Sequence, residues 1–325
     1  MLERQAAPQA PVCGAFLGWD ALAALERLGV DPWALGARPI RRVRVIAGAR
    51  VVERRLPGLA AGLSRQRLDH ALLLQAEGLG CGVERGVAVR AADGTVVHLG
   101  DGAALSAEAL FLATGKHKLR GAPREGAIGG HVGLRTTGPA CADLAEVVEL
   151  HLFRGGYAGL LLQEDGCSNL CLSVTATRLA EAGSPDQLVD LLGREAPRLG
   201  ERLVQGRGEW RAIAGVPYGW RARDTTPGLF RVGDQAGVIA SLAGDGIAIA
   251  LASGRMAAET YRREGAVAAP AFQRRFAARA ARPIQVGELL RRTAERPRAA
   301  ANWLAGPGRL PGAMRLAAAL TRIGG

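Results

Sequence analysis

The sequence predicts an α/β protein of two domains followed by a helical C-terminal segment. Strand and helix patterns alternate between residues 20 and 115, three apolar runs between residues 147 and 174 indicate antiparallel strands, and the segment after residue 266 is helical. The chain has 325 residues and is 48% hydrophobic, so it can bury the cores of two domains. This composition excludes an intrinsically disordered protein.

Two helical patterns with a strand pair between them occupy the first part of the chain. Asp20 is suited to cap a helix whose leucines share one face and which stops at Gly29. Residues 43–53 form two apolar runs around a small-residue turn, which predicts a pair of strands. Residues 64–78 return to helical spacing.

Turn residues divide the middle of the chain into short strands. Asp93 and Gly94 join two alternating runs, which is the strongest hairpin signal in the sequence. Residues 109–115 predict a buried strand that ends in a glycine turn. The later elements are an antiparallel meander at residues 147–153, 157–163 and 169–174, a helix at 185–192, a strand at 228–232 and a long helix after 246.

The basic residues are concentrated at the C-terminal end. The chain has 42 basic and 30 acidic residues, a formal charge of +12, and residues 265–325 hold 11 arginines but only Glu288 and Glu295 as acids. Amphipathic helices here have three interpretations: a cover for the core with a solvated arginine face, peripheral contact with an anionic membrane, or nucleic-acid binding. Aromatic residues are sparse and no nucleic-acid motif is present, so we expect no nucleic-acid partner.

The cysteines and the N-terminal residues indicate a cytoplasmic protein, either free or peripheral to the inner face of the membrane. Five cysteines, an odd number, favour reduced thiols. No apolar run is long enough to cross a membrane, and the first residues lack a signal-peptide pattern. Cys167 and Cys171 favour packed thiols over metal ligands because no second Cys/His pair accompanies them, so no metal site is predicted.

The most informative stretch begins at the strand at 228–232. Gly233 and Asp234 follow it, and after a loop of small residues Gly244, Asp245 and Gly246 open the long helix. Glycines allow close approach of a ligand, a helix N-terminus offers free N–H groups, and a fixed carboxylate can accept hydrogen bonds from sugar-like hydroxyls. The spacing alone favours a ligand site and an ordinary glycine-rich turn equally.

The string FRVGDQAGVIASLAGDGIAIAL resembles the second FAD signature of the flavoprotein superfamily that includes p-hydroxybenzoate hydroxylase and the geranylgeranyl reductases. The resemblance implies that Asp234 binds a ribityl hydroxyl of FAD and that Gly233 gives it room. It also places Gly244, Gly246 and Ile247 beside the pyrimidine edge of the isoalloxazine.

Other segments resemble the same superfamily in the same order. Residues 11–29 are similar to the Cys-Gly motif of reductase-like members, SRQRLDHALL to the helix whose arginine reaches the cofactor, and FLATG to the turn against the adenosine half of FAD. The implied cofactor contacts are Cys13, Gly14, Arg65, Ala113, Thr114 and Gly115. Cys13 is the one weak candidate for a catalytic role, and a buried neutral thiol is the alternative.

The sequence departs from the superfamily at its N-terminus. Members open with a strand, G-x-G-x-x-G and a helix that hold the pyrophosphate, and this motif is absent near Met1. Residues 1–4 instead resemble the end of the second strand, where Glu3 matches the acid that binds the adenosine ribose, with Arg4 beside it. About 30 residues of a βαβ unit are therefore expected to be missing, through a start assigned too far downstream or a truncated gene.

The resemblance implies a three-layer, Rossmann-like FAD/NAD(P)-binding domain with an inserted antiparallel-sheet substrate domain and a helical C-terminal cap. The expected boundaries are 1–39, 57–122 and 225–264 for the FAD domain, 40–56 and 123–224 for the substrate domain, and 265–325 for the cap.

The function that the resemblance implies is that of an FAD-dependent oxidoreductase with NAD(P)H as electron donor. It would act on a hydrophobic small molecule, an isoprenoid, a phenolic lipid or a polyketide, by flavin-mediated reduction or by monooxygenation. The alternative is a truncated, non-catalytic remnant that acts as a binding protein. The oligomeric state is open.

Overall fold

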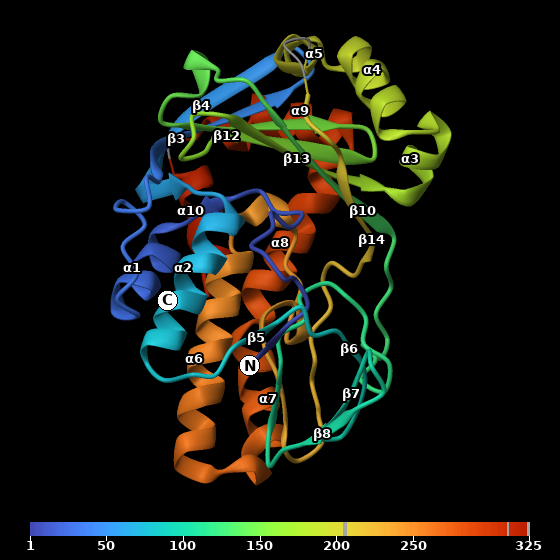
Figure 1. The fold of residues 1–325 in the computed structure, drawn as a ribbon. Coiled ribbons are helices and arrows are strands. Elements are labelled where there is room, and N and C mark those ends of the chain that lie inside the picture. The colour runs from blue at the N-terminus through green and yellow to red at the C-terminus, as the bar shows by residue number, and fades with distance from the viewer. Residues whose placement is uncertain (204–206, 311, 324–325) are drawn as a thin grey trace.

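An eight-stranded sheet and a set of smaller sheets with long helices form the two halves of the molecule (Figure 1). The computed structural model describes residues 1–203, 207–310 and 312–323. The architecture is mixed α/β with helices at the C-terminal end, which confirms the predicted fold class.

The large sheet has the strand order β14-β10-β13-β12-β11-β3-β4-β2. Its neighbours are antiparallel except β11 and β3, which are parallel. The predicted meander is therefore confirmed as β11, β12 and β13. The strands are β2 (Phe16–Leu17), β3 (Arg38–Ala47), β4 (Arg50–Gly62), β10 (His131–Gly138), β11 (Val147–Phe153), β12 (Gly156–Leu162), β13 (Ser168–Thr175) and β14 (Arg211–Val216).

Helices cover both faces of this sheet. On the outer face, α3 (Ala176–Ala182), α4 (Pro185–Glu195) and α5 (Pro197–Leu203) bury Leu188, Leu192 and Leu199 against strand residues such as Leu172. On the other face, α8 (Ala281–Ala294) and α9 (Pro297–Ala305) bury Ala294 and Leu304 against the sheet, and α10 (Ala313–Leu320) follows. Each fully buried leucine stabilises the fold by about 2 kcal/mol, so these helices are part of the folded core.

The second half contains two parallel strand pairs and a small antiparallel sheet. β1 (Leu2–Glu3) pairs with β5 (Glu84–Arg85), and β9 (Leu110–Leu112) pairs with β15 (Leu229–Arg231). Among the described residues, no strand joins one pair to the other. The antiparallel sheet comprises β6 (Val89–Asp93), β7 (Val96–Leu99) and β8 (Ala104–Ser106), so the predicted hairpin at Gly94 is confirmed.

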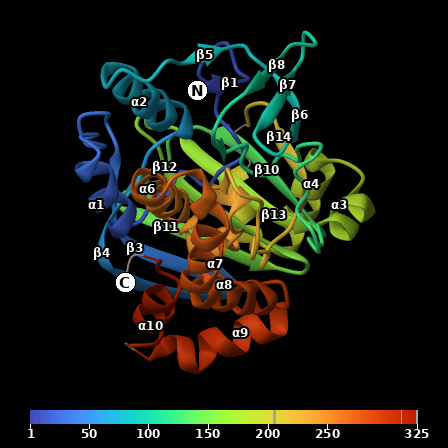
Figure 2. The same ribbon diagram turned by 90° about the horizontal axis from the view of Figure 1, so that it is seen from below.

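Long helices bury the core of this half. The helices are α1 (Trp19–Arg27), α2 (Arg65–Gly78), α6 (Gly246–Glu264) and α7 (Ala269–Arg279). Leu25, Leu68, Phe230, Ile249 and Phe272 belong to one buried cluster between them. Viewed from below, α6, α7 and α8 lie in front of the eight-stranded sheet, so α6 approaches the sheet with its N-terminal end (Figure 2).

One sequence-based expectation about a helix end is wrong. Asp20 does not cap α1, because Gly18 is the N-cap residue and Asp20 lies in the first turn beside Arg322. Pro283 lies in the first turn of α8, where proline is tolerated because its missing N–H has no partner to lose. No helix in the described ranges is long and apolar enough to span a membrane.

Candidate functional site

The turns that follow β9 and β15 lie against each other. The strands are parallel neighbours, so their carboxyl ends meet at one edge, the place where open α/β sheets bind ligands. The buried amide of Gln235 joins the turns: its Nε2 donates to Thr114 Oγ1 at 2.7 Å and to the His117 carbonyl at 2.8 Å. The structure thus brings Thr114 and Gly115 next to Gly233 and Asp234.

An ion pair occupies this edge. Lys116 Nζ lies 3.1 Å from Asp234 Oδ2, and both side chains are 24% exposed. Burial by itself lowers the pKa of Lys116, but Asp234, Tyr218 and Cys13 together raise it above its ordinary value. The Lys116 ammonium therefore stays charged at neutral pH and holds the Asp234 carboxylate in place.

Arg124 ties the two turns together from the other side. Its guanidinium donates to the carbonyls of Gly115, of Lys116 at 3.0 Å and of Asp234 at 3.3 Å. Burial lowers the pKa of Arg124, whereas Asp234 raises it, and the lowering prevails. Backbone carbonyls that accept from one guanidinium are fixed relative to each other, so this edge is preorganised.

Cys13 lies near both Lys116 of this ion pair and Arg65 on α2. The Cys13 carbonyl accepts from Asn169 Nδ2 at 3.2 Å, which anchors this segment on β13. Arg65 donates to both carboxylate oxygens of Asp69 on its own helix, at 2.7 and 2.9 Å. Burial lowers the pKa of Arg65, but Asp69 and the neighbouring Cys13 raise it above its ordinary value.

The glycines before α6 differ in their surroundings. Gly244 adopts φ +72°, and a Cβ added there would lie 2.8 Å from the Phe16 ring, so this position requires glycine. At Gly246, the first residue of α6, a Cβ would meet no described atom within 4 Å. The same holds at Gly14. Ile247 packs against the cluster of buried apolar residues that surrounds α6.

The remaining predicted residues are Glu3 and Arg4, which lie at the end of β1, and Ala113, which lies in the turn after β9. The Glu3 carboxylate accepts from the backbone N–H of Gln5 at 2.8 Å, a local turn contact. Burial lowers the pKa of His117, and Arg4 lowers it further, which places Arg4 near the turn after β9. Ala113 in that turn is exposed.

Hydroxyl groups from three segments meet beside the loop that precedes α6. Ser241 Oγ lies 2.6 Å from Tyr157 Oη on β12 and 3.1 Å from Tyr218 Oη. The backbone N–H of Leu242 donates to Tyr157 Oη at 3.1 Å. Burial and the neighbouring Tyr218 keep the pKa of Tyr157 well above 10, so its hydroxyl is neutral.

Sequence reasoning did not identify several of these residues. Lys116, Arg124, Gln235 and Tyr218 contact the site through pairs more than 80 residues apart or through turns without a motif. Two of them stand directly beside predicted residues in the sequence: Lys116 follows the Ala-Thr-Gly turn, and Gln235 follows Asp234.

The cysteines show no metal-binding arrangement. All five thiols are free, and the described residues contain no group of three or more His, Cys, Asp or Glu side chains that could hold a metal ion. Burial raises the pKa of Cys171 to about 12, so that thiol is neutral at physiological pH.

The chain is similar to known proteins in its three-dimensional structure, and no match was found for its sequence. No protein-family model matches the chain. No curated protein matches its sequence. Among solved structures, PqsL from Pseudomonas aeruginosa, a probable FAD-dependent monooxygenase, is 17% identical with a TM-score of 0.66, over 93% of this chain and 91% of that chain.

Two further structures have the same fold. The flavin-dependent brominase Bmp2 is 15% identical with a TM-score of 0.74, over 98% of this chain and 87% of that chain. The halogenase PltM is 13% identical with a TM-score of 0.70, over 98% of this chain and 80% of that chain.

Proposed function

We propose that the chain is an FAD-dependent oxidoreductase that acts on a hydrophobic small molecule with NAD(P)H as electron donor. The observation that carries the proposal is the convergence of Gly115, Gly233 and Asp234 at the carboxyl edge of the β9–β15 pair. The fold that the chain shares with a probable FAD-dependent monooxygenase and with two flavin-dependent halogenating enzymes supports it.

The residues fit the ribityl and isoalloxazine parts of FAD. Asp234 is a fixed acceptor for ribityl hydroxyls, and the open space at Gly14 and Gly246 leaves room for a planar ring, because a Cβ at either glycine would meet no described atom within 4 Å. The first N–H groups of α6 have no intrahelical partner and can donate to the carbonyl oxygens of the pyrimidine edge. Bound FAD would supply hydride transfer or oxygen activation.

The chain's own groups would orient this cofactor and control protons. Lys116 holds the Asp234 side chain and Arg124 holds its backbone carbonyl. The Asp234 carboxylate therefore needs little reorganisation to accept a hydrogen bond from a ribityl hydroxyl. A group of hydroxyls lies between β12 of the large sheet and the loop that precedes α6; it comprises Tyr157, Ser241 and Tyr218. These hydroxyls can position or protonate an oxygen of a bound substrate. Cys13 remains the candidate thiol beside this site.

Both reaction types remain proposals, and one experiment separates them. Monooxygenation is favoured by the neighbours' descriptions, and reduction by the Cys13-Gly14 motif. Protein reconstituted with FAD should oxidise NAD(P)H in the presence of the substrate. Oxidation that persists without oxygen contradicts the monooxygenase, and oxidation that stops without oxygen contradicts the reductase.

A flavin-free binding protein is the second candidate function. It is favoured by one observation, that no strand among the described residues connects the β1–β5 pair to the β9–β15 pair, so the sheet between the adenosine and ribityl ends is interrupted. Absorbance of the purified protein decides between the two. A flavin band, or its appearance on reconstitution with FAD, excludes the second candidate, and colourless protein that takes up no FAD excludes the first.

We also propose peripheral contact with an anionic membrane through α8. Leu289 is 65% exposed, and the exposed Arg282 and Arg292 lie on the same side of α8 at helical spacing. Flotation with anionic vesicles at low salt should carry the protein upward, and Leu289→Gln should reduce the bound fraction. Failure of the wild-type protein to float contradicts the proposal.

A further inference from the structure

The described C-terminal residues return to the N-terminal end of α6. Arg322 Nη1 lies 2.5 Å from Asp245 Oδ1, and the backbone N–H of Ile323 donates to Asp245 Oδ2 at 3.1 Å. The Ile323 carbonyl in turn accepts from Nε and Nη2 of Arg279 on α7, at 3.1 and 3.0 Å. Both oxygens of the Asp245 carboxylate are therefore bound by the C-terminal segment.

The start of α1 is shaped around the same arginine. The Arg322 guanidinium lies over the Trp19 ring, 4.2 Å from its centroid, and 3.6 Å from Asp20 Oδ1. A Cβ added to Gly18 would come within 2.6 Å of Arg322 Nη1, so the absence of a side chain at Gly18 makes room for the guanidinium. Arg322 is buried by these contacts.

Asp245 occupies the N-cap position of α6 but does not cap the helix. Aspartate is among the best N-cap residues because its carboxylate accepts from the second or third N–H of the helix. Here, within the described part of the chain, no such bond exists, since Arg322 and Ile323 hold the carboxylate. The N–H groups of Ile247 and Ala248, at the second and third helical positions, are thus left without the cap.

The cluster formed by Arg322, Asp245 and Asp20 contains two carboxylates but only one guanidinium. Asp20 and Asp245 share the single guanidinium of Arg322, and Asp20 Oδ2 is buried with no hydrogen-bond partner among the described residues. Burial raises the pKa of Asp245, Arg322 lowers it and Asp20 raises it again, and the result is a pKa of about 7. Loss of Arg322 would therefore leave a carboxylate that needs new donors, and the nearest are those of its own helix.

We propose that Arg322 is a positioning residue: by holding the Asp245 carboxylate away from α6, it keeps the first-turn N–H groups of that helix free for the pyrimidine edge of the flavin. The consequence for flavin binding rests on the proposed function. The consequence for the helix N-terminus does not.

Three variants separate positioning from simple stabilisation. Arg322→Gln should lower the unfolding temperature, slow hydrogen exchange at the amides of Ile247 and Ala248, and weaken FAD binding roughly fivefold, the equilibrium worth of one N-cap hydrogen bond. Adding Asp245→Asn removes the buried charge but keeps a side chain that caps, so the unfolding temperature should recover while exchange stays slow and FAD binding stays weak. Adding Asp245→Ala removes both, so fast exchange and FAD affinity should return.

The matched control is Arg255→Gln, which removes an exposed arginine from the same helix and should change none of these quantities. Equal FAD affinities for the Asn and Ala double variants would overturn the proposal, as would unchanged amide exchange in Arg322→Gln. If the wild-type protein binds no FAD, the proposed function fails, and the exchange measurements still decide whether Arg322 keeps α6 uncapped.

Discussion

Two buried carboxylates in this molecule have opposite protonation behaviour. Glu149 on β11 is 1% exposed and Asp245 at the start of α6 is 0% exposed, yet the pKa of Glu149 falls to about 2 and that of Asp245 rises to about 7. Burial alone raises the pKa of both. The difference must therefore come from the groups that surround each carboxylate.

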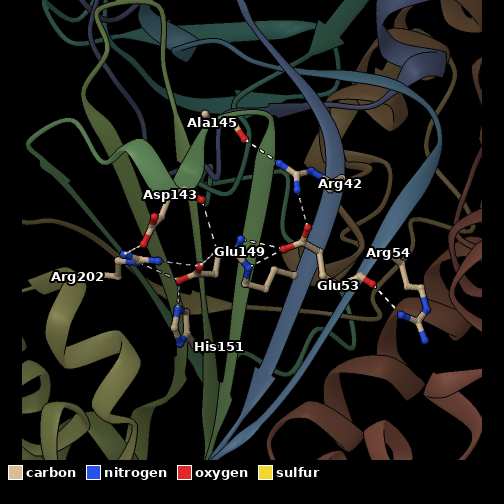
Figure 3. A network of polar contacts seen from close by, with 9 residues as sticks. Arg42, Glu53, Arg54, Asp143, Ala145, Glu149, His151 and Arg202 are labelled. Carbon is tan, nitrogen blue, oxygen red and sulfur yellow. Dashed lines mark hydrogen bonds and ion pairs between the residues drawn. The ribbon is translucent and has the colours of Figure 1, made fainter.

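Glu149 is surrounded by cationic and hydrogen-bonding partners. His151 Nε2 lies 2.7 Å from Glu149 Oε1, and Arg202 approaches both carboxylate oxygens at 3.3 Å (Figure 3). Arg44 Nη1 lies 2.8 Å from Glu149 Oε2. These donors join β11 to β3 and α5 on the outer face of the large sheet. Asp245, in contrast, shares one guanidinium with Asp20.

The contrast shows that the number of opposite charges around a buried carboxylate decides its protonation state here. The cluster around Glu149 is fully compensated and holds the large sheet and α5 together. The cluster around Asp245 is short of one cation, and it lies next to the helix end that we propose for the cofactor. Four substitutions test this difference between the two clusters.

The largest effect is expected at Glu149. Glu149→Gln leaves the guanidinium groups of Arg44 and Arg202 without their shared partner, so the free energy of unfolding should fall by about 3 kcal/mol at pH 7. Because the folded-state pKa is lowered, the contribution of Glu149 is present above its unfolded value and disappears as the pH falls toward 2. Urea unfolding at pH 7 and pH 3 measures both. A loss of the same size at both pH values would contradict this explanation.

Gly18→Ala should break the other cluster without removing a charge. The added methyl group would displace the Arg322 guanidinium from Asp245, which should cost about 2 kcal/mol in urea unfolding. Gly254→Ala in α6 is the control, since a Cβ there meets no described atom within 4 Å, and it should stabilise the protein by about 1 kcal/mol. If Gly18→Ala and Gly254→Ala changed the free energy of unfolding equally, the packing around Arg322 would not contribute to stability.

Removal of a buried charge usually destabilises a protein, whereas Asp245→Asn should increase the free energy of unfolding at high pH. The folded pKa of Asp245 is raised above its unfolded value, so its contribution is fully present only below the unfolded value of about 4 and is lost as the pH rises from there to about 7. The variant should therefore gain stability over wild type as the pH rises from about 4 to about 8, by on the order of 1 kcal/mol or more, and this gain should vanish below about pH 4. Thermal unfolding across this range is the measurement, and a stability difference independent of pH contradicts the assignment.

The smallest effect is expected for an exposed ion pair. Arg41 Nε lies 3.0 Å from Glu146 Oε1, but solvent reaches both side chains. Glu146→Gln should change the free energy of unfolding by about 0.3 kcal/mol. A loss comparable to that of Glu149→Gln would mean that ion-pair geometry, and not compensation within the buried interior, determines the effect.

The sequence predicted those parts of the fold that depend on local patterns. The β11–β13 meander and the hairpin at Gly94 follow from alternation and turn residues, which act between near neighbours in the chain. Thr114 and Asp234 were assigned to one cofactor only through the resemblance, and the parallel pairing of β9 with β15 that brings them to one edge was not predicted.

The rest of the site depends on contacts that no local pattern encodes. Arg322 and Asp245 are 77 residues apart, and Arg124 reaches Asp234 across 110. Asp20 was assigned as a cap because Asp before a helical pattern usually caps it, whereas tertiary contact with Arg322 determines its role here.

The most direct test of a flavin site at the edge of β9 and β15 is an equilibrium titration of the purified protein with FAD, followed by flavin fluorescence, for wild type and two alanine variants. Asp234→Ala removes the proposed ribityl acceptor, and Asp190→Ala removes an exposed carboxylate on α4, on the outer face of the large sheet. We predict saturable quenching for wild type and Asp190→Ala, and binding weakened about tenfold or more in Asp234→Ala. Identical titrations for all three proteins, or no quenching in any, would contradict a flavin site at the edge of β9 and β15.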